Sequence, residues 1–293
     1  MVLITEEKLL SWIKPASDSE ETRCNSTINN IKNCIQNYDF ERLGQPEIRL
    51  RGSYNNNTNV KNDSDVDMYA LFNGFYYDVD QNFHIIPGVY GTGIPYENFK
   101  TAITLCLRRK YGLENVKYGN KSIKIKNNSY RVNADVVPVV KANYYGLCNI
   151  EGVAFFSSDS QFIINFPDQD CTNGREKNNS TSNRYKFFVR IFKRLRNELE
   201  DEGILKFKIP SYVIESLLYN IPDQYFMTKT YTTGVINIVN YLLGKLDTFR
   251  FVEVNHIKEM FRPDLFPEQT TTRLEVKVYL SLIWQSISEA QAA

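Results

Sequence analysis

The sequence predicts an α+β protein in which strands and helices share the first part of the chain and helices alone follow. Two segments, Val66–Phe72 and Tyr130–Val140, alternate in side-chain character with period two, which is typical of strands. From Tyr185 onward, apolar residues recur at helical spacing. We therefore expect a core lobe with a mixed β-sheet at residues 1–185 and a helical C-terminal lobe at residues 186–293.

The composition is that of a globular protein with a real core. Of 293 residues, 42% are hydrophobic and 24% charged, and 35 Lys and Arg nearly balance 34 Asp and Glu. A dedicated duplex-binding protein usually has a basic excess, so we expect no stable nucleic-acid partner.

Cysteine and histidine usage excludes several kinds of site. The five Cys are scattered without a CxxC pair, which indicates reduced thiols, and the two His are far apart in sequence. A zinc site or a His-based triad is therefore poorly supported. Glu6 and Glu7 interrupt the segment that a signal peptide would need to be apolar, and no window reaches the length of a membrane span. We expect a cytoplasmic monomer without a membrane partner.

The first part of the chain alternates between helix and strand patterns. Pro15 ends the first helix, and Gly119-Asn120 marks a turn between two short strands. Helices are expected at Thr5–Lys14, Ile28–Tyr38 and Tyr96–Tyr111, and strands at Glu47–Leu50, Val66–Phe72, Val116–Tyr118, Ser122–Lys126, Tyr130–Val140, Gly152–Phe156 and Phe162–Phe166. We expect Tyr54–Asn62 to be a polar loop and Asn73–Pro95 to be an irregular insertion or a hairpin.

The second part is mostly helical. Pro167–Asn183 is polar and is expected to be an ordered loop or lid that leads into an amphipathic helix at Tyr185–Leu199. Pro210 precedes a further helix, as proline often does at the first helical turn. Two more helices are expected around Gly234–Leu246 and Arg273–Ala290.

Two adjacent acids indicate the chemistry. Asp65 and Asp67 project from one face of their strand because residues i and i+2 share a face. Their mutual repulsion favours a cation, and carboxylate oxygens suit Mg²⁺. The turn at Gly52-Ser53 offers backbone N–H groups and a hydroxyl for a phosphate. The alternative is a hairpin with a solvated acidic edge.

Asp135 is a third candidate ligand. It is the lone acid of an otherwise apolar strand, where a charge is costly unless it is paired or bound to a metal. The alternative is a salt bridge to a nearby Arg or Lys. Together with Asp65 and Asp67 it would hold two Mg²⁺ ions, or Mn²⁺, for an in-line phosphoryl displacement.

The helical lobe offers further candidates. Lys186 or Lys193, together with Ser211, would reach the β- and γ-phosphates of a nucleotide, and Tyr212 would stack on a base. Lys186 and Lys193 belong to a polar stripe with Arg190 and Asn197, and the alternative is that this stripe is a solvated helix face.

These motifs carry a family resemblance. Gly52-Ser53, Asp65-Val66-Asp67 and Ala134-Asp135-Val136 resemble the signature of polymerase-β-type nucleotidyltransferases. Residues 173–178, 184–197 and 210–215 are similar to the lid and helical-lobe motifs of the bacterial cGAS/DncV-like nucleotidyltransferases (CD-NTases), most of all to the CdnE clade. The resemblance covers nearly the whole chain.

The resemblance implies a synthase of cyclic oligonucleotides, most of all cyclic dinucleotides. Such an enzyme condenses nucleoside triphosphates (ATP, GTP or UTP) in a cleft between its two lobes and releases pyrophosphate. Its product is a second messenger that switches on a separate effector protein in defence against phage. Some family members select a pyrimidine through an Asn in the lid, and Asn173 is the candidate for that position, with a plain turn residue before Gly174 as the alternative.

Two rival functions stay open at this point. One is another polymerase-β-type transferase, which would tail RNA or nucleotidylate a small molecule or a protein. The other is a nucleotide sensor without activity, but such a protein would be expected to have lost one of the three acids.

Overall fold

The computed structural model describes residues 4–14, 17–60, 65–88, 95–146 and 148–292, and packing divides them into two compact units. The helical unit comprises residues 1–15, 57–60 and 168–293, and the sheet unit comprises residues 16–56 and 61–167. The division at residue 185 expected from the sequence stays a prediction, because packing groups the short segments 1–15, 57–60 and 168–185 with the C-terminal helices.

The sheet unit is built on one mixed sheet. Its strands, within the described residues, are β1 (Glu47–Arg51), β2 (Val66–Asp80), β3 (Val116–Tyr118), β4 (Ile123–Ile125), β5 (Ala134–Tyr145), β6 (Asn149–Phe156) and β7 (Phe162–Asn165). The strand order is β1-β2-β5-β4-β3, and β6 lies off this path, where it pairs with β5 and β7. Only the β2–β5 pair is parallel among these ladders; the other strand pairs are antiparallel. The expected mixed sheet is therefore confirmed.

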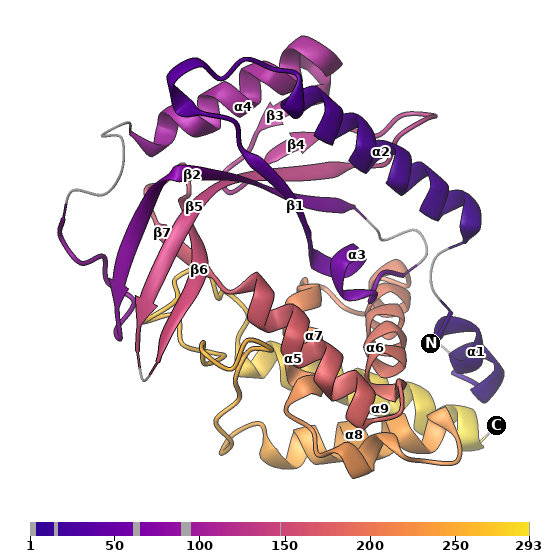
Figure 1. Cartoon of the computed structure of the whole chain (residues 1–293). Helices are drawn as coiled ribbons and strands as arrows, with labels where there is room; N and C mark the ends of the chain where they lie inside the picture. The colour runs from indigo at the N-terminus through magenta and orange to yellow at the C-terminus, as the bar shows by residue number, and fades with distance from the viewer. Residues whose placement is uncertain (1–3, 15–16, 61–64, 89–94, 147, 293) are drawn as a thin grey trace. The chain divides into compact units, whose positions relative to one another are not determined.

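Two long helices cover one face of this sheet. They are α2 (Asp18–Gln36) and α4 (Tyr96–Tyr111), which lie together over the strands in Figure 1. Ile28, Ile31 and Ile35 of α2 share a buried cluster with Ile103 and Leu107 of α4 and with side chains of β2 and β5. Full burial of one such side chain contributes about 1.5–3 kcal/mol. This layer fixes the two central strands from one side.

The helical unit is organised around α6 (Arg184–Asp201). Its apolar stripe, including Phe188, Phe192 and Leu195, is almost completely buried, as the helical spacing predicts. The phenol of Tyr279 donates a hydrogen bond of 2.6 Å to the carbonyl of Phe192. The other helices of this unit are α1 (Glu6–Trp12), α5 (Pro167–Ser180), α7 (Ser211–Tyr219), α8 (Tyr231–Lys245) and α9 (Arg273–Ala292). Short 3₁₀ turns lie at Glu41–Leu43, Leu113–Asn115 and Asp223–Phe226.

Two expectations from the sequence are wrong. The expected loop after Gly52 begins with a short helix, α3 (Gly52–Asn56), and the polar segment after Pro167 is the helix α5 rather than a loop or lid. After Phe72, β2 continues to Asp80 past a register shift between Phe72 and Tyr76. An antiparallel bridge between Val79 and Ile85 then turns the chain back, so the described part of this segment is a hairpin, which is one of the two expected alternatives. Proline is compatible with the first turn of a helix, so Pro167 does not argue against α5. The segment was expected to be a loop because almost all of its residues are polar. Residues 89–94 of the expected insertion lie outside the described residues.

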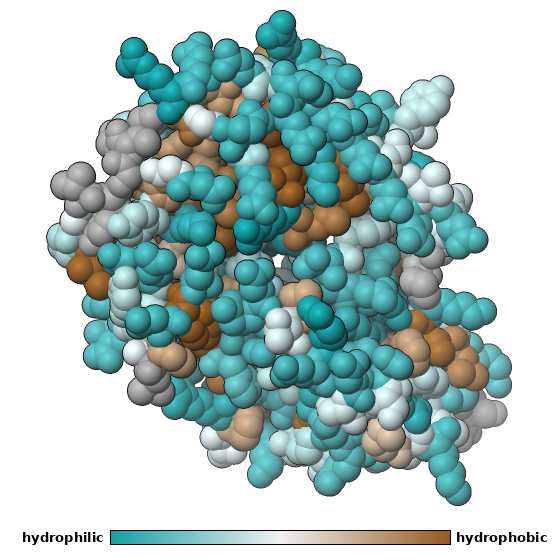
Figure 2. Space-filling model, viewed as in Figure 1, coloured by the Kyte–Doolittle hydropathy of each residue, from teal (hydrophilic) through white to brown (hydrophobic). Residues whose placement is uncertain are grey.

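The surface is mainly polar where Figure 2 shows it, with apolar side chains gathered in smaller patches. No helix within the described part of the chain is long and apolar enough to cross a membrane.

Gly52 illustrates how tightly β1, α3 and β2 meet. Its φ is +65°, a conformation that L-residues rarely adopt, and an added Cβ would collide with Oδ2 of Asp67. Gly44 also has a positive φ, +72°, but an added Cβ there would meet no atom within 4 Å. Substitution of Gly44 by Ala would therefore cause backbone strain alone, whereas substitution of Gly52 by Ala would cause backbone strain and a steric collision with Asp67.

We predict that Gly52→Ala destabilises the protein by about 1–3 kcal/mol through strain, with a further collision penalty. Asp67→Ala removes the colliding atom, so the double variant should recover about 1 kcal/mol relative to additivity. Denaturant unfolding of the four proteins measures this coupling. The matched cycle of Gly44→Ala with Asp67→Ala should be additive, and additivity in the Gly52 cycle as well would contradict the packing described here.

Candidate active site

Asp67 and Asp135 lie directly opposite each other on the neighbouring parallel strands β2 and β5. Residues in register on adjacent strands project from the same face of a sheet, so the two carboxylates are neighbours. Asp65 precedes the first residue of β2 and is exposed. The structure thus sets two of the predicted metal ligands, Asp67 and Asp135, side by side, and the third, Asp65, lies two residues before Asp67.

A basic residue lies in register on the outer side of each acid. Arg51 of β1 is the partner of Asp67, and Lys124 of β4 is the partner of Asp135. Since the strands run in the order β1-β2-β5-β4, this face carries the charge row Arg51, Asp67, Asp135, Lys124. The sequence analysis missed Arg51 and Lys124, although the strand pattern places both on strands that lie beside the acidic ones.

The environment of Asp67 disfavours its charged form. Burial raises the pKa of its carboxyl, and the nearby carboxylates of Asp135 and Asp65 raise it further. The guanidinium of Arg51 and the ammonium of Lys124 act in the opposite direction but leave the pKa above its ordinary value. A half-buried carboxylate with two acidic neighbours is a group that an added cation would stabilise.

Asp135 already has a cationic neighbour. Nζ of Lys124 lies 3.5 Å from Oδ2 of Asp135, and the lysine side chain is 60% exposed. Exposed pairs of this kind contribute about 0–1 kcal/mol, so a stronger cation could displace the lysine. The salt bridge that the sequence analysis kept as the alternative for Asp135 is therefore present, and it is weak.

The three acids fit a divalent metal by their chemistry. All are carboxylates, the hard oxygen ligands that Mg²⁺ and Mn²⁺ prefer, and the raised pKa of Asp67 marks uncompensated negative charge. Within the described residues, no group of three or more His, Cys, Asp or Glu side chains is arranged to hold an ion as it stands. Metal binding would therefore require side-chain rotation, for which exposed Asp65 and the weak Lys124 pair leave room.

Gly52 and Ser53 lie at the junction of β1 and α3, beside Asp67. Because an added Cβ on Gly52 would collide with Asp67, the absence of a side chain is what allows this turn to approach the acid. The predicted phosphate-binding turn and two of the predicted metal ligands, Asp67 and Asp135, therefore belong to the same face of the sheet unit.

The two candidate lysines of α6 differ sharply. The Lys193 side chain is buried, and its ammonium donates to Glu215 at 2.5 Å and to the carbonyl and hydroxyl of Thr58 at 3.1 and 3.2 Å. All three of its protons are engaged. Lys186 is half-buried, and its ammonium makes no hydrogen bond or ion pair with any described residue. Burial lowers the pKa of Lys186, as expected for a cation that lacks a close partner.

Arg190 belongs to the same polar stripe on α6 as Lys193, and it too has a structural role. Arg190 is buried and donates to the carbonyls of Ile13 and Asn57, each at 2.8 Å. Together with Lys193 it binds the backbone of Asn57 and Thr58, which follow α3. Neither side chain belongs to a solvated helix face, because both are buried and hold this backbone.

Ser211 and Tyr212 begin α7. The Ser211 hydroxyl accepts a hydrogen bond of 3.1 Å from Arg196, which is itself buried and also donates to the carbonyl of Ile209. Arg196 fixes the start of this helix, and the sequence analysis missed it because it lies outside the stripe that was considered. Tyr212 is 41% exposed, although burial of its phenol raises the pKa of that group.

Asn173 lies on α5. Its Nδ2 donates to the carbonyl of Val254 at 2.8 Å, and it lines a cavity of about 610 Å³ formed by residues of the helical unit, among them Tyr219, Tyr241 and Phe249. None of the other predicted site residues lines this cavity. The structure thus shows Asn173 as a helix residue tied to the segment after α8, and not as a turn residue.

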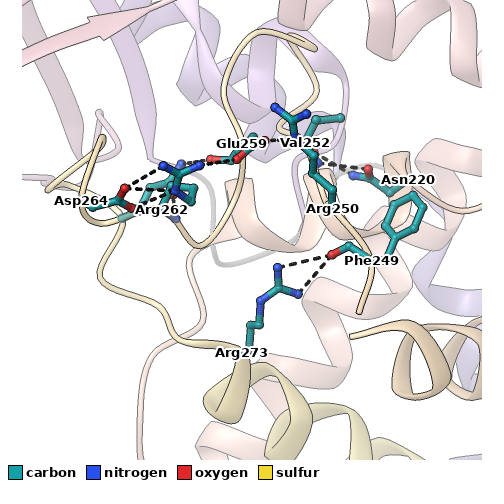
Figure 3. A network of polar contacts seen from close by, with 9 residues as sticks. Asn220, Phe249, Arg250, Val252, Glu259, Arg262, Asp264 and Arg273 are labelled. Carbon is teal, nitrogen blue, oxygen red and sulfur yellow. Dashed lines mark hydrogen bonds and ion pairs between the residues drawn. The ribbon is translucent and has the colours of Figure 1, made fainter. Parts of the chain in front are cut away.

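A polar network holds that segment. Arg262 pairs with Glu259 and with Asp264, both at 2.7 Å, and Arg250 also pairs with Glu259, as Figure 3 shows. In the same view Asn220 of α7 exchanges two hydrogen bonds with the backbone of Val252. This region therefore provides a fixed support for α5.

Asp170 is a titratable group of α5 that the sequence analysis missed. Burial and the neighbouring Glu253 raise the pKa of its carboxyl to about 7, although Asn255 donates to it at 3.1 Å. The position gave no signal in the sequence, because the whole segment is polar and was expected to be a loop.

Comparison with known proteins identifies the class. Residues 172–288 match the cGAS/DncV-like nucleotidyltransferase C-terminal helical domain. The chain is 35% identical to the cyclic dipyrimidine nucleotide synthase CdnE of Legionella pneumophila, over 97% of this chain and 98% of that protein.

Solved structures agree with this assignment. The CdnE c-UMP-AMP synthase of Rhodothermus marinus, solved with Apcpp and Upnpp, superposes with a TM-score of 0.83 at 27% identity, over 99% of this chain and 97% of that one. The CdnE cyclic dinucleotide synthase of Elizabethkingia meningoseptica, solved with GTP and Apcpp, gives a TM-score of 0.81 at 29% identity, over 96% and 98%. The fold is thus that of polymerase-β-like nucleotidyltransferases. Within that class, the chain belongs to the cGAS/DncV-like nucleotidyltransferase family, and the resemblance found in the sequence is confirmed.

The titration of Asp170 predicts a pH-dependent stability. An unfolded Asp carboxyl ionises near pH 3.8, whereas the folded one stays protonated up to about pH 7. Between these values the unfolded chain binds fewer protons, so this group lowers the free energy of unfolding as the pH rises. Asp170→Asn should remove that loss.

We expect Asp170→Asn to gain about 2 kcal/mol in stability relative to the unmodified protein between pH 5 and pH 8. Urea unfolding at the two pH values measures it, with Asp201→Asn, an exposed acid at the end of α6, as the control. An equal difference at both pH values would show that Asp170 does not titrate as described.

Proposed function

We propose that this protein is a metal-dependent cyclic dinucleotide synthase, which joins two nucleoside triphosphates and releases pyrophosphate. The observation that carries the proposal is the pairing of Asp67 with Asp135 across β2 and β5, with Asp65 two residues away, in a chain of this family. The relatives support it, since they are named as synthases of cyclic nucleotides.

We propose that Asp65, Asp67 and Asp135 hold two Mg²⁺ ions, which Mn²⁺ can replace. When bound, such ions activate the attacking hydroxyl and stabilise charge on the leaving oxygen. The acids themselves contribute position, because the strand register fixes the Cα atoms of Asp67 and Asp135 whatever occupies the site. Lys124 would neutralise Asp135 when no ion is bound.

We propose that phosphate binding is shared by Gly52, Ser53 and Lys186. Gly52 lies against the Asp67 side chain, which supports a phosphate-binding role for its turn, and the Lys186 ammonium has no partner among the described residues. Lys193 is the weaker of the two candidates, since releasing its ammonium would leave the largely buried Glu215 carboxylate without its cation, which typically costs about 3–5 kcal/mol. Ser211, held by Arg196, is proposed to donate to a phosphate oxygen.

Base selection is the least constrained part of the proposal. Tyr212 offers an exposed ring for stacking, which does not discriminate between bases. The relatives differ among themselves, since one is named a dipyrimidine synthase and another a c-UMP-AMP synthase. Asn173 remains the candidate for reading a pyrimidine. One Nδ2 proton donates to the carbonyl of Val254, and Oδ1 and the second Nδ2 proton are the groups proposed for that role.

We further propose that the product is a second messenger for a separate effector protein in defence against phage. The family membership supports this role, and ATP, GTP and UTP are the candidate substrates because analogues of these nucleotides or GTP itself were bound in the solved relatives.

The test is product formation from labelled nucleoside triphosphates. Purified protein with Mg²⁺ or Mn²⁺ should give a small product that resists phosphatase, and chelation with EDTA should abolish it. The double variant Asp65→Asn with Asp67→Asn should lose at least about 100-fold of this activity without loss of thermal stability, because the charges removed repel each other.

Asp201→Asn, a change of the same chemistry at an exposed position, should retain full activity. A labelled product that forms only after RNA is added would favour the tailing activity instead. Undiminished cyclic product from the double variant would refute the assignment of the acids.

A further inference from the structure

Cys34 and Cys106 meet between the two helices that cover the sheet. Their Sγ atoms are 3.6 Å apart, with Cys34 on α2 and Cys106 on α4. Each thiol also lies against the other's backbone: Sγ of Cys34 is 3.7 Å from the carbonyl oxygen of Cys106, and Sγ of Cys106 is 3.6 Å from that of Cys34. Both cysteines are free thiols, and 71 residues separate them in the chain. The pair is thus created by the fold, and its members are far apart in sequence.

The two thiols are chemically unequal. Cys34 is half-buried, whereas Cys106 is buried. A hydrogen bond from Cys106 and the ammonium of Lys110 lower the pKa of Cys34, and the same hydrogen bond together with burial raises the pKa of Cys106. The accessible member is therefore the better nucleophile, and its neighbour is a protonated thiol placed behind it.

From this geometry we propose that Cys34 and Cys106 form a peroxide-oxidisable dithiol that closes to a reversible disulfide between α2 and α4. The sequence analysis assigned all five cysteines to a reduced state, and neither residue belongs to the candidate active site. The two sulfur atoms are already in contact, so closure requires a shift of about 1.5 Å to reach the bond length of about 2.05 Å.

The reaction balances with a hydroperoxide as oxidant. The Cys34 thiolate attacks one oxygen of the peroxide, breaks the O–O bond and becomes a sulfenic acid, and hydroxide leaves. The sulfur of Cys106 then attacks the Cys34 sulfur, the S–O bond breaks, and the departing hydroxide takes the Cys106 proton. In total two thiols and hydrogen peroxide give one disulfide and two waters, and a dithiol reductant reverses the change.

Closing the bond would tether the helix layer over the sheet. The disulfide would close a loop of about 70 residues that includes β1, α3 and the whole of β2, so the unfolded chain would lose considerable freedom. The oxidised protein should therefore melt about 5 °C or more above the reduced one. Tyr54 of α3 donates a hydrogen bond to Cys24, which also lies on α2, so the tethered helix is one that contacts α3.

The experiment uses the full chain, oxidised with a few equivalents of hydrogen peroxide, alkylated and mapped by mass spectrometry. We expect a peptide pair linked through Cys34 and Cys106, a mass lower by two hydrogens, and a melting temperature that falls back after treatment with dithiothreitol. Cys171→Ala, which changes another partly buried cysteine, should behave like the unmodified protein.

Cys106→Ala should keep Cys34 as a sulfenic acid that dimedone traps, and it should show no rise in melting temperature on oxidation. If this variant fails to fold, the peptide map of the unmodified chain still decides the question. Oxidation of exposed Cys148 without any linkage of Cys34 to Cys106 would overturn the proposal.

Discussion

The parallel pairing of β2 with β5 is the constraint on which the site depends. It sets two carboxylates, Asp67 and Asp135, side by side, with a basic residue in register beyond each one. The arrangement is electrostatically unfavourable by itself, as the raised pKa of Asp67 shows. The fold tolerates it because buried apolar residues of both strands, covered by α2 and α4, hold the register independently of the charges.

Helix α6 serves the helical unit in a comparable way, but with buried cations. Arg190 and Lys193 bind the backbone of Asn57 and Thr58, which follow α3 in the chain. Both cations donate to carbonyl groups, and Lys193 also pairs with Glu215. Within the described residues, Lys186 is the cation of this stripe whose side chain makes no hydrogen bond or ion pair. Helix α6 thus contributes apolar side chains to the core of its unit, buried cations that hold the backbone after α3, and Lys186 as a candidate phosphate ligand.

The central strands and the candidate metal ligands could be predicted from the sequence, because the strand periodicity and the positions of the acids pointed to the same segments. The alternation around Asp67 and the lone acid Asp135 in an apolar strand predicted both the sheet and the candidate ligands. What failed depended on tertiary contacts: α5 is polar throughout and is held by the segment around Val254. Arg51 and Lys124 became visible only through strand order, and the Cys34–Cys106 contact only through the packing of two helices.

The central claim is that the paired acids form a divalent-metal site that is completed by a nucleotide. Electron paramagnetic resonance of Mn²⁺, titrated into the protein with a non-hydrolysable nucleoside triphosphate analogue, tests this directly. The account predicts two bound ions per chain and the loss of at least one of them in Asp135→Asn, while the circular dichroism spectrum stays unchanged. Unaltered Mn²⁺ binding in that variant would contradict the claim.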